Sequence, residues 1–163
     1  MTSLTSQPRR YPALAAFLAV TFAASAIGSW ATIDNVRTWY PTIAKPSWTP
    51  PNWLFGPVWT LLYTLMAIAA WRVWRTRQGA EARSVLNLYG SQLALNTLWS
   101  VLFFALHRPG LALIEISALW ALLVLAQVRF WRADRIAGIL WAPYRAWVSF
   151  ATALNAAIWW LNR

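Results

Sequence analysis

Aromatic and amide side chains at helical spacing are the residues of this sequence with the clearest capacity for chemistry. Trp59 and Tyr63 lie four residues apart, so both fall on one face of a helix. Tyr144, Trp147 and Ala151 share a helical face in the same way. Indole and phenol rings offer flat apolar walls with a polar edge, and a small alanine lets a ligand approach closely. The pattern indicates a pocket for a flat, largely apolar ligand, unless these rings serve only helix packing.

Polar side chains inside apolar segments show which helix faces avoid lipid. Gln92, Asn96 and Trp99 fall at i, i+4 and i+7, and an amide that faces lipid would have no hydrogen-bond partner. We therefore expect this face to point at other helices, either as a ligand contact or as interhelical hydrogen bonding. Glu115 is the acidic residue inside an apolar segment, and Arg145 is considered as its ion-pair partner.

Residue counts exclude several kinds of chemistry. The sequence has no cysteine and a single histidine, His107. We therefore expect no metal site built from thiolates or histidines. No nucleophile–base pair is recognisable, and tryptophan and tyrosine are the redox-active side chains on offer.

The composition is typical of a membrane protein. Of 163 residues, 60% are hydrophobic, 11% are charged and 14 are tryptophan, which is too apolar for an ordinary soluble surface. The net charge of +10 does not indicate nucleic-acid binding, because the basic residues gather at the ends of apolar segments, where they suit lipid head groups. We therefore expect membrane lipid as a partner and no nucleic acid.

The apolar segments predict an all-α fold, an integral membrane bundle of five transmembrane helices that forms one domain over residues 1–163. Each span is long enough to cross a hydrocarbon core of about 30 Å, and the spans lie at about 11–31, 52–74, 84–106, 111–130 and 139–161. The first span shares some features with a signal peptide. Its length and the later spans favour a retained helix.

A stiff loop is predicted between the first two spans, over residues 34–51. Pro46, Pro50 and Pro51 fix φ and restrict the residues that precede them. We expect Thr49 to cap the following helix with its hydroxyl, with the last two prolines in the first turn.

The distribution of basic residues predicts the orientation. Five spans place the N-terminus and the second and fourth connections on one side, with Arg9, Arg10, Arg72, Arg75, Arg77, Arg83, Arg129, Arg132 and Arg135. The opposite side carries Arg37, Lys45, Arg108 and Arg163. Since cytoplasmic loops are enriched in basic residues, we expect the N-terminus to be cytoplasmic.

Three runs of the sequence resemble the TspO/translocator protein family, also called the tryptophan-rich sensory protein or peripheral benzodiazepine receptor family. The runs are PSWTPPNWLFGPVWTLLY at 46–63, QLALNTLWS at 92–100 with FFA shortly after, and PYRAWVSFATALN at 143–155. They occur in this order across the five spans. The resemblance covers essentially the whole chain and implies a bacterial membrane protein that forms a homodimer.

The resemblance also implies a pocket between helices that binds porphyrins such as protoporphyrin IX, as a ligand and not as a resident cofactor. By motif position, the ligand-binding residues would be Trp39, Tyr40, Pro50, Trp59, Tyr63, Asn96, Trp147 and Ala151. Some family members bind sterols. Here Ala156 stands where the sterol pattern needs a tyrosine, so tight sterol binding is doubtful.

Three functions follow from these expectations. The first is a receptor, sensor or carrier that binds a tetrapyrrole. The second is an enzyme that degrades porphyrin in light, for which Trp59 and Trp147 would be the catalytic residues implied by the resemblance. The third, coupled transport, would depend on Glu115 and ranks last, because this carboxyl lies near a helix end.

Overall fold

The structure is a computed structural model that describes residues 10–163. It is a bundle of five long helices: α1 (Arg10–Thr38), α2 (Phe55–Thr76), α3 (Gly79–Ser100), α4 (Pro109–Ala133) and α5 (Arg135–Leu161). Short 3₁₀ turns, Tyr40–Thr42 and Asn52–Leu54, lie between α1 and α2, and a π-helical segment, Val101–Ala105, extends α3. The all-α prediction is confirmed, and residues 10–163 contain no strand.

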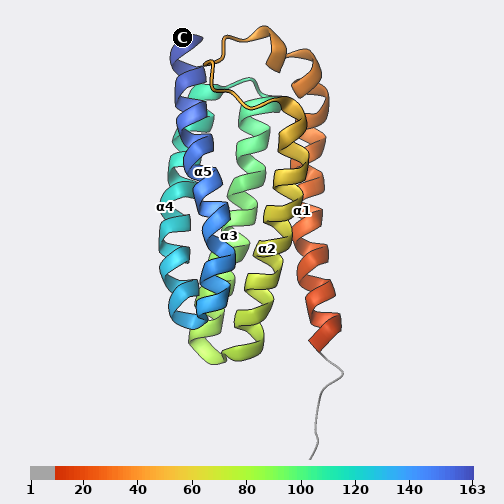
Figure 1. The fold of residues 1–163 in the computed structure, drawn as a ribbon, viewed down its shortest axis with the longest axis vertical. Coiled ribbons are helices and arrows are strands. Elements are labelled where there is room, and N and C mark those ends of the chain that lie inside the picture. Colours follow the sequence, from red (N-terminus) through yellow and green to blue (C-terminus); the bar gives the residue numbers. More distant parts are fainter. Residues whose placement is uncertain (1–9) are drawn as a thin grey trace, which may run out of the picture.

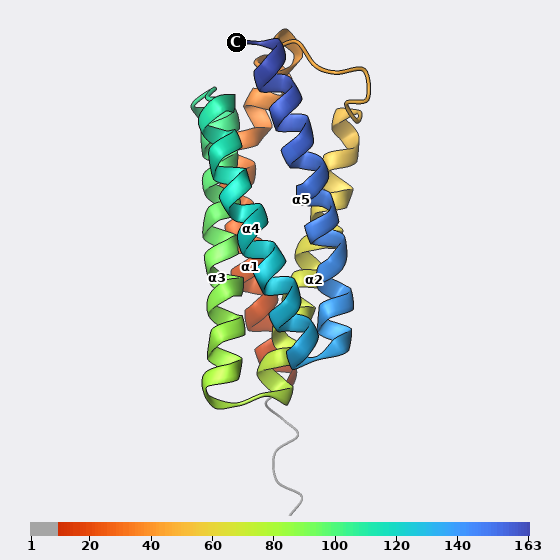
Figure 2. The same cartoon turned by 90° about the vertical axis from the view of Figure 1, so that its left-hand side faces the viewer.

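The helices run side by side and form a closed ring in the order α1, α2, α5, α4, α3 (Figures 1 and 2). The turns from α2 to α3 and from α4 to α5 lie at the lower end in Figure 1, beside the start of α1. The long loop from α1 to α2, the connection from α3 to α4 and the C-terminus lie at the upper end. Side chains from several helices can therefore meet inside the ring near its upper end.

Length suits all five helices to a membrane, and three of them are also apolar enough to span it. Three helical segments, Tyr11–Thr38, Asn52–Thr76 and Pro109–Ala133, are long and apolar enough to cross a bilayer. The other two, α3 and α5, are of similar length, with 22 and 27 residues, and bury their amides at Gln92, Asn96 and Asn155 inside the bundle. The predicted orientation of the Gln92 and Asn96 face is thus confirmed, and no amide of this group faces lipid.

Helix α1 is longer than the sequence prediction, which placed a loop from residue 34. It continues to Thr38, because nothing breaks it before Pro41 and its polar side chains bond within the helix. Asn35 Nδ2 donates to Ala31 O at 3.0 Å, and Thr38 Oγ1 donates to Asp34 O at 2.8 Å. The last turn of α1 therefore projects past the apolar segment.

The start of α2 also differs from the prediction. Thr49 does not cap the helix; its Oγ1 donates to Pro46 O at 2.7 Å and closes a turn within the loop. Pro51 is extended, with φ −63° and ψ 143°, so it lies outside the helix. The chain then forms one 3₁₀ turn and enters α2 at Phe55.

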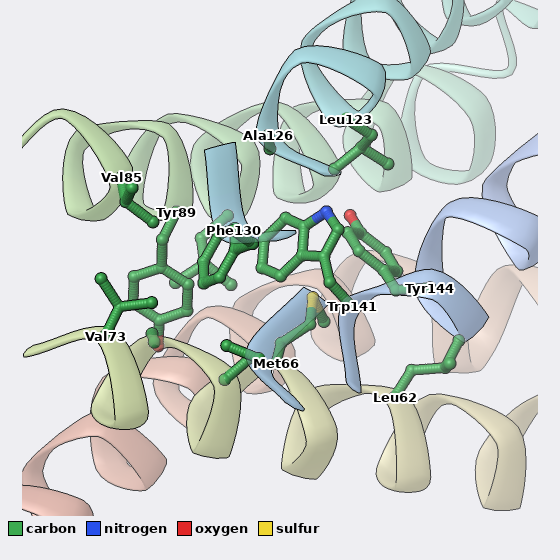
Figure 3. Packing of buried hydrophobic residues seen from close by; sticks show 14 of the residues in the cluster. Leu62, Met66, Val73, Val85, Tyr89, Leu123, Ala126, Phe130, Trp141 and Tyr144 are labelled. Atoms are coloured by element: carbon green, nitrogen blue, oxygen red, sulfur yellow. The ribbon is translucent and has the colours of Figure 1, made fainter. Parts of the chain in front are cut away.

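The core of the bundle lies between α2, α3, α4 and α5 (Figure 3). Trp141 and Phe130 stack with ring centroids 4.2 Å apart and planes 17° apart. Tyr144 lies at right angles to Trp141, with ring centroids 5.7 Å apart. Met66 of α2 packs beside Trp141 in the same cluster (Figure 3). Because lipid tails are as apolar as these rings, their close contacts stabilise the bundle through van der Waals packing.

Polar contacts fasten both ends of the bundle. At the lower end Arg72 Nη2 lies 2.9 Å from Asp134 Oδ2, and Ala137 N–H donates to Asp134 Oδ1 at 2.9 Å. At the upper end the Asn162 side chain accepts from Ala44 N and donates to Ala44 O, both at 2.9 Å. The α1–α2 loop is thereby held against the end of α5.

Candidate ligand-binding site

A cavity of about 790 Å³ lies inside the ring near its upper end, between α1, α2, the end of α3 and α5. Its volume falls in the range of roughly 300–1,000 Å³ that is usual for small-molecule sites. The lining includes Trp53, which is 72% exposed, so the cavity reaches the surface of the bundle. No residue of α4 lines it within the described chain.

Aromatic rings from three helices form the walls. Trp59 and Tyr63 of α2 lie side by side with centroids 5.3 Å apart. On α5, Trp147 meets Phe150 at 5.5 Å and the edge of Phe55 at 6.1 Å. Because these rings line the same cavity, they offer flat apolar surfaces to a ligand on more than one side.

A hydrogen bond fixes the ring of Tyr63. Asn96 Nδ2 of α3 donates to the Tyr63 hydroxyl oxygen at 2.7 Å, and Ser25 of α1 also hydrogen-bonds this hydroxyl. Asn96 is 3% exposed. The amide therefore orients a lining residue from behind the cavity wall.

A second amide holds the α3 wall in the same way. Asn155 Oδ1 of α5 accepts from Trp99 Nε1 at 2.9 Å, while Asn155 Nδ2 donates to Pro109 O at 2.8 Å. Trp99 in turn stacks on Phe103 at 5.3 Å. This chain of contacts connects α3, the start of α4 and α5 around the cavity.

Helix α1 contributes the polar side of the lining. Ser25, Ser29 and Thr32 fall at i, i+4 and i+7 and all line the cavity, together with Arg37 in the last turn. Thr32 donates its hydroxyl to Gly28 O at 2.7 Å. The opposite walls are mainly aromatic, so the site has one polar face and several apolar faces.

Five of the eight residues named from the sequence line the cavity: Tyr40, Trp59, Tyr63, Trp147 and Ala151. They come from the loop after α1, from α2 and from α5. Tyr40 is 2% exposed, and burial raises the pKa of its phenol to about 12. The structure thus brings together residues that lie far apart in the chain.

The other three lie outside the lining. Trp39 stacks on His107 with centroids 4.3 Å apart and meets the edge of Phe103 at 5.7 Å. Pro50 is half-buried in the loop, and Asn96 lies behind Tyr63. These residues shape the loop and the walls in this structure and do not face the cavity.

Sequence reasoning did not name several lining residues as ligand contacts: Ser25, Ser29, Thr32, Arg37, Phe55, Phe103, Phe150 and Asn155. The sequence pattern that could have identified the α1 residues is a hydroxyl side chain at i, i+4 and i+7 in an otherwise apolar span. Such a row of polar side chains is expected to face the inside of a bundle. The contribution of Phe103 depends on the π-helical segment at the end of α3. Regular helical spacing does not reveal that segment.

Glu115 lies on α4, outside the cavity. It is 8% exposed, and neither carboxylate oxygen has a hydrogen-bond partner among residues 10–163. Arg145, considered as its partner, is exposed and forms no ion pair within the described chain. The cavity and this buried carboxyl are therefore separate features of the bundle.

Comparison with known proteins identifies the family. Residues 16–161 match the model of the TspO/MBR family. The chain is 44% identical over 147 residues to the tryptophan-rich protein TspO of Archaeoglobus fulgidus, which covers 90% of this chain and 92% of that protein. It is 42% identical over 147 residues to protein CrtK of Rhodobacter capsulatus, which covers 88% of this chain and 91% of that protein.

A human relative extends this similarity. Over 123 residues the chain is 37% identical to the translocator protein of Homo sapiens, with 74% of this chain and 73% of that protein covered. The family match, over residues 16–161, begins within α1 and extends to the end of α5. Family match, helical architecture and apolar spans agree, and the chain is therefore an integral membrane protein of the TspO/MBR family.

Proposed function

We propose that this protein is a membrane receptor, sensor or carrier that binds porphyrins, such as protoporphyrin IX, in the cavity between α1, α2, α3 and α5. The observation that carries the proposal is the convergence of Trp59, Tyr63 and Trp147 on one cavity of about 790 Å³. A flat macrocycle with polar edge groups suits aromatic walls that face a side of hydroxyl groups. The family match and the names of the relatives support a sensory or translocator role.

Light-dependent porphyrin degradation is the second candidate. It is favoured by one observation, that Trp59 and Trp147 both line the cavity. A bound porphyrin would then have indole rings on two sides. In this candidate the excited porphyrin and oxygen supply the reactivity, and the protein holds the ring against readily oxidised side chains.

We also propose that the N-terminus faces the cytoplasm. The end of the bundle that holds the α2–α3 and α4–α5 turns carries Arg72, Arg75, Arg77, Arg83, Arg129, Arg132 and Arg135. The other end carries Arg37, Lys45, Arg108 and Arg163, and Arg9 lies outside the described residues. The excess of basic residues supports a cytoplasmic lower end, so the cavity would open toward the opposite side.

The binding proposal is tested by titrating the purified protein with protoporphyrin IX in the dark and following tryptophan fluorescence. Ala151 lines the cavity, whereas Ala153 is two residues further on the same helix and is exposed. Ala151→Leu fills part of the cavity, and Ala153→Leu adds the same atoms outside it. We expect at least about a tenfold loss of affinity in the first variant and none in the second.

Two results would overturn the proposal. One is the absence of saturable binding to the wild-type protein. The other is an unchanged affinity in Ala151→Leu, because a ligand that tolerates this side chain does not occupy the cavity. Thermal unfolding of both variants in detergent serves as the control for folding.

A further inference from the structure

The lining of the cavity carries a single charged side chain. Within the described chain, Arg37 is the only acidic or basic residue that lines it. The neighbouring Tyr40 adds no negative charge at neutral pH, because a phenol has an ordinary pKa of 10, and burial raises the pKa of this one further, to about 12. The guanidinium charge is thus not offset by any acidic group in the lining.

This charge lies at the open end of the cavity. Arg37 is in the last turn of α1, beside Tyr40 and Pro41 in the lining. Trp53, in the 3₁₀ turn before α2, is 72% exposed, whereas Tyr63, further into α2, is 7% exposed. The cavity therefore has a cationic mouth and an aromatic interior.

The Arg37 side chain is exposed and has no ion pair or hydrogen bond within residues 10–163. Asp34, one turn earlier on α1, does not pair with it. Lys45, a basic residue of the same loop region, is already engaged: its Nζ donates to Tyr40 O at 2.6 Å and to Ile43 O at 2.8 Å. Among these two cations, only Arg37 is available to an incoming group.

We propose that Arg37 anchors a carboxylate of the ligand at the mouth of the cavity. The inference rests on the proposed function, since it gives this residue a role toward the ligand of the same cavity. A guanidinium can hold a carboxylate through two parallel N–H···O bonds, which gives orientation as well as affinity. The macrocycle then extends toward Trp59 and Tyr63 with its apolar face against the rings.

A phosphate of a lipid head group could engage the same guanidinium, because arginines at helix ends often extend to the membrane interface. The two anions are distinguished by working in a neutral maltoside detergent without phospholipid. A preference for an acidic ligand under these conditions belongs to the ligand site. If Arg37 serves only lipid, no such preference is expected.

The experiment compares protoporphyrin IX, which has two carboxylates, with its dimethyl ester, by dark titration of wild type, Arg37→Gln and Arg108→Gln. Arg108 precedes α4 at the same end of the bundle and does not line the cavity, so its variant controls for net charge. We expect wild type and Arg108→Gln to bind the acid at least about tenfold more tightly than the ester. Arg37→Gln should lose this preference by weakening the acid alone, and Arg37→Lys should restore part of it.

The outcomes separate this inference from the proposed function. Equal affinities of the wild-type protein for acid and ester would overturn the anchor and leave porphyrin binding in place. A preference retained in Arg37→Gln would also overturn the anchor. Failure of both ligands to bind wild type would overturn the proposed function and the anchor together.

Discussion

Asn96 of α3 and Tyr63 of α2 are joined by a hydrogen bond of 2.7 Å from the amide nitrogen to the phenol oxygen. Both side chains are buried, and only the tyrosine lines the cavity. The position of the Tyr63 ring beside Trp59 thus depends on a residue that a ligand does not touch. The residue that holds this part of the wall in place, Asn96, is therefore different from the residue that meets the cavity, Tyr63.

This pair gives a prediction for stability. Tyr63→Phe leaves the buried amide of Asn96 without this partner, and Asn96→Leu removes the donor, so each change should lower the free energy of unfolding by about 1–3 kcal/mol. The double variant has no unpaired amide and should be less destabilised than the sum, with a coupling of about 1 kcal/mol. Unfolding in detergent measures all four proteins. Additive losses would show that the hydrogen bond contributes nothing to stability.

A close approach of α4 and α5 gives a second prediction. A Cβ at Gly138 would lie 2.8 Å from Trp131 Cα and 2.8 Å from Trp131 Cε3, and the backbone atom cannot move without separating the helices. Gly138→Ala should therefore destabilise the bundle by about 1–3 kcal/mol. Gly90→Ala is the control, because nothing lies within 4 Å of its added Cβ.

The control should be neutral or stabilising by about 0.5–1 kcal/mol, since alanine is the better helix former. Thermal unfolding of both variants in the same detergent is the measurement. Equal stability of the two variants would contradict the close packing of α4 on α5.

The ion pair between Arg72 and Asp134 at the lower end predicts that the stability of the folded state falls at acidic pH. Burial alone would raise the pKa of Asp134, but hydrogen bonds from the Ala137 N–H and from Arg72, with the charge of the guanidinium, bring it below its ordinary value of 3.8. A carboxyl with a lowered pKa stabilises the folded state fully above the ordinary value. That stability is lost as the pH falls through the lower, folded-state pKa.

Unfolding temperatures measured between about pH 6 and about pH 3 test this dependence. Asp134→Asn keeps a side-chain oxygen that can cap α5 but removes the charge, so its unfolding temperature should vary less with pH than that of wild type. Asp34→Asn removes a charge that forms no ion pair in the described chain and should follow wild type. Parallel curves for wild type and Asp134→Asn would rule out this carboxylate as the acid-sensitive group.

Particular residues show how far the sequence predicts this molecule. Apolar segments and the inward face of Gln92 and Asn96 predicted an all-helical bundle and its buried amides. Local boundaries were less predictable: Thr49 closes a turn within the loop and does not cap α2, because two successive prolines hold the chain extended. The length of α1 depends on side-chain bonds at Asn35 and Thr38, which composition does not show.

The residues that line the cavity were also only partly predictable from the sequence. Tyr40, Trp59, Tyr63, Trp147 and Ala151 were named from sequence and do line it. The hydroxyl stripe of α1 was missed, because helical spacing identifies a face but not the helices that surround it. Its contribution follows from the ring order, which places α1 between α2 and α3.

The two tryptophans of the cavity decide between a binding protein and a light-dependent enzyme. The double variant Trp59→Phe/Trp147→Phe keeps aromatic walls but removes both indoles. Its affinity for protoporphyrin IX in the dark should therefore stay within about a factor of three of the wild-type value. If the protein degrades porphyrin, loss of the porphyrin absorbance band under light should stop in this variant. Trp30→Phe with Trp160→Phe removes two exposed indoles outside the cavity and should bleach porphyrin at the wild-type rate. If wild type and the cavity variant bleach porphyrin equally, the indoles of Trp59 and Trp147 take no part in the reaction, because bleaching then proceeds without them.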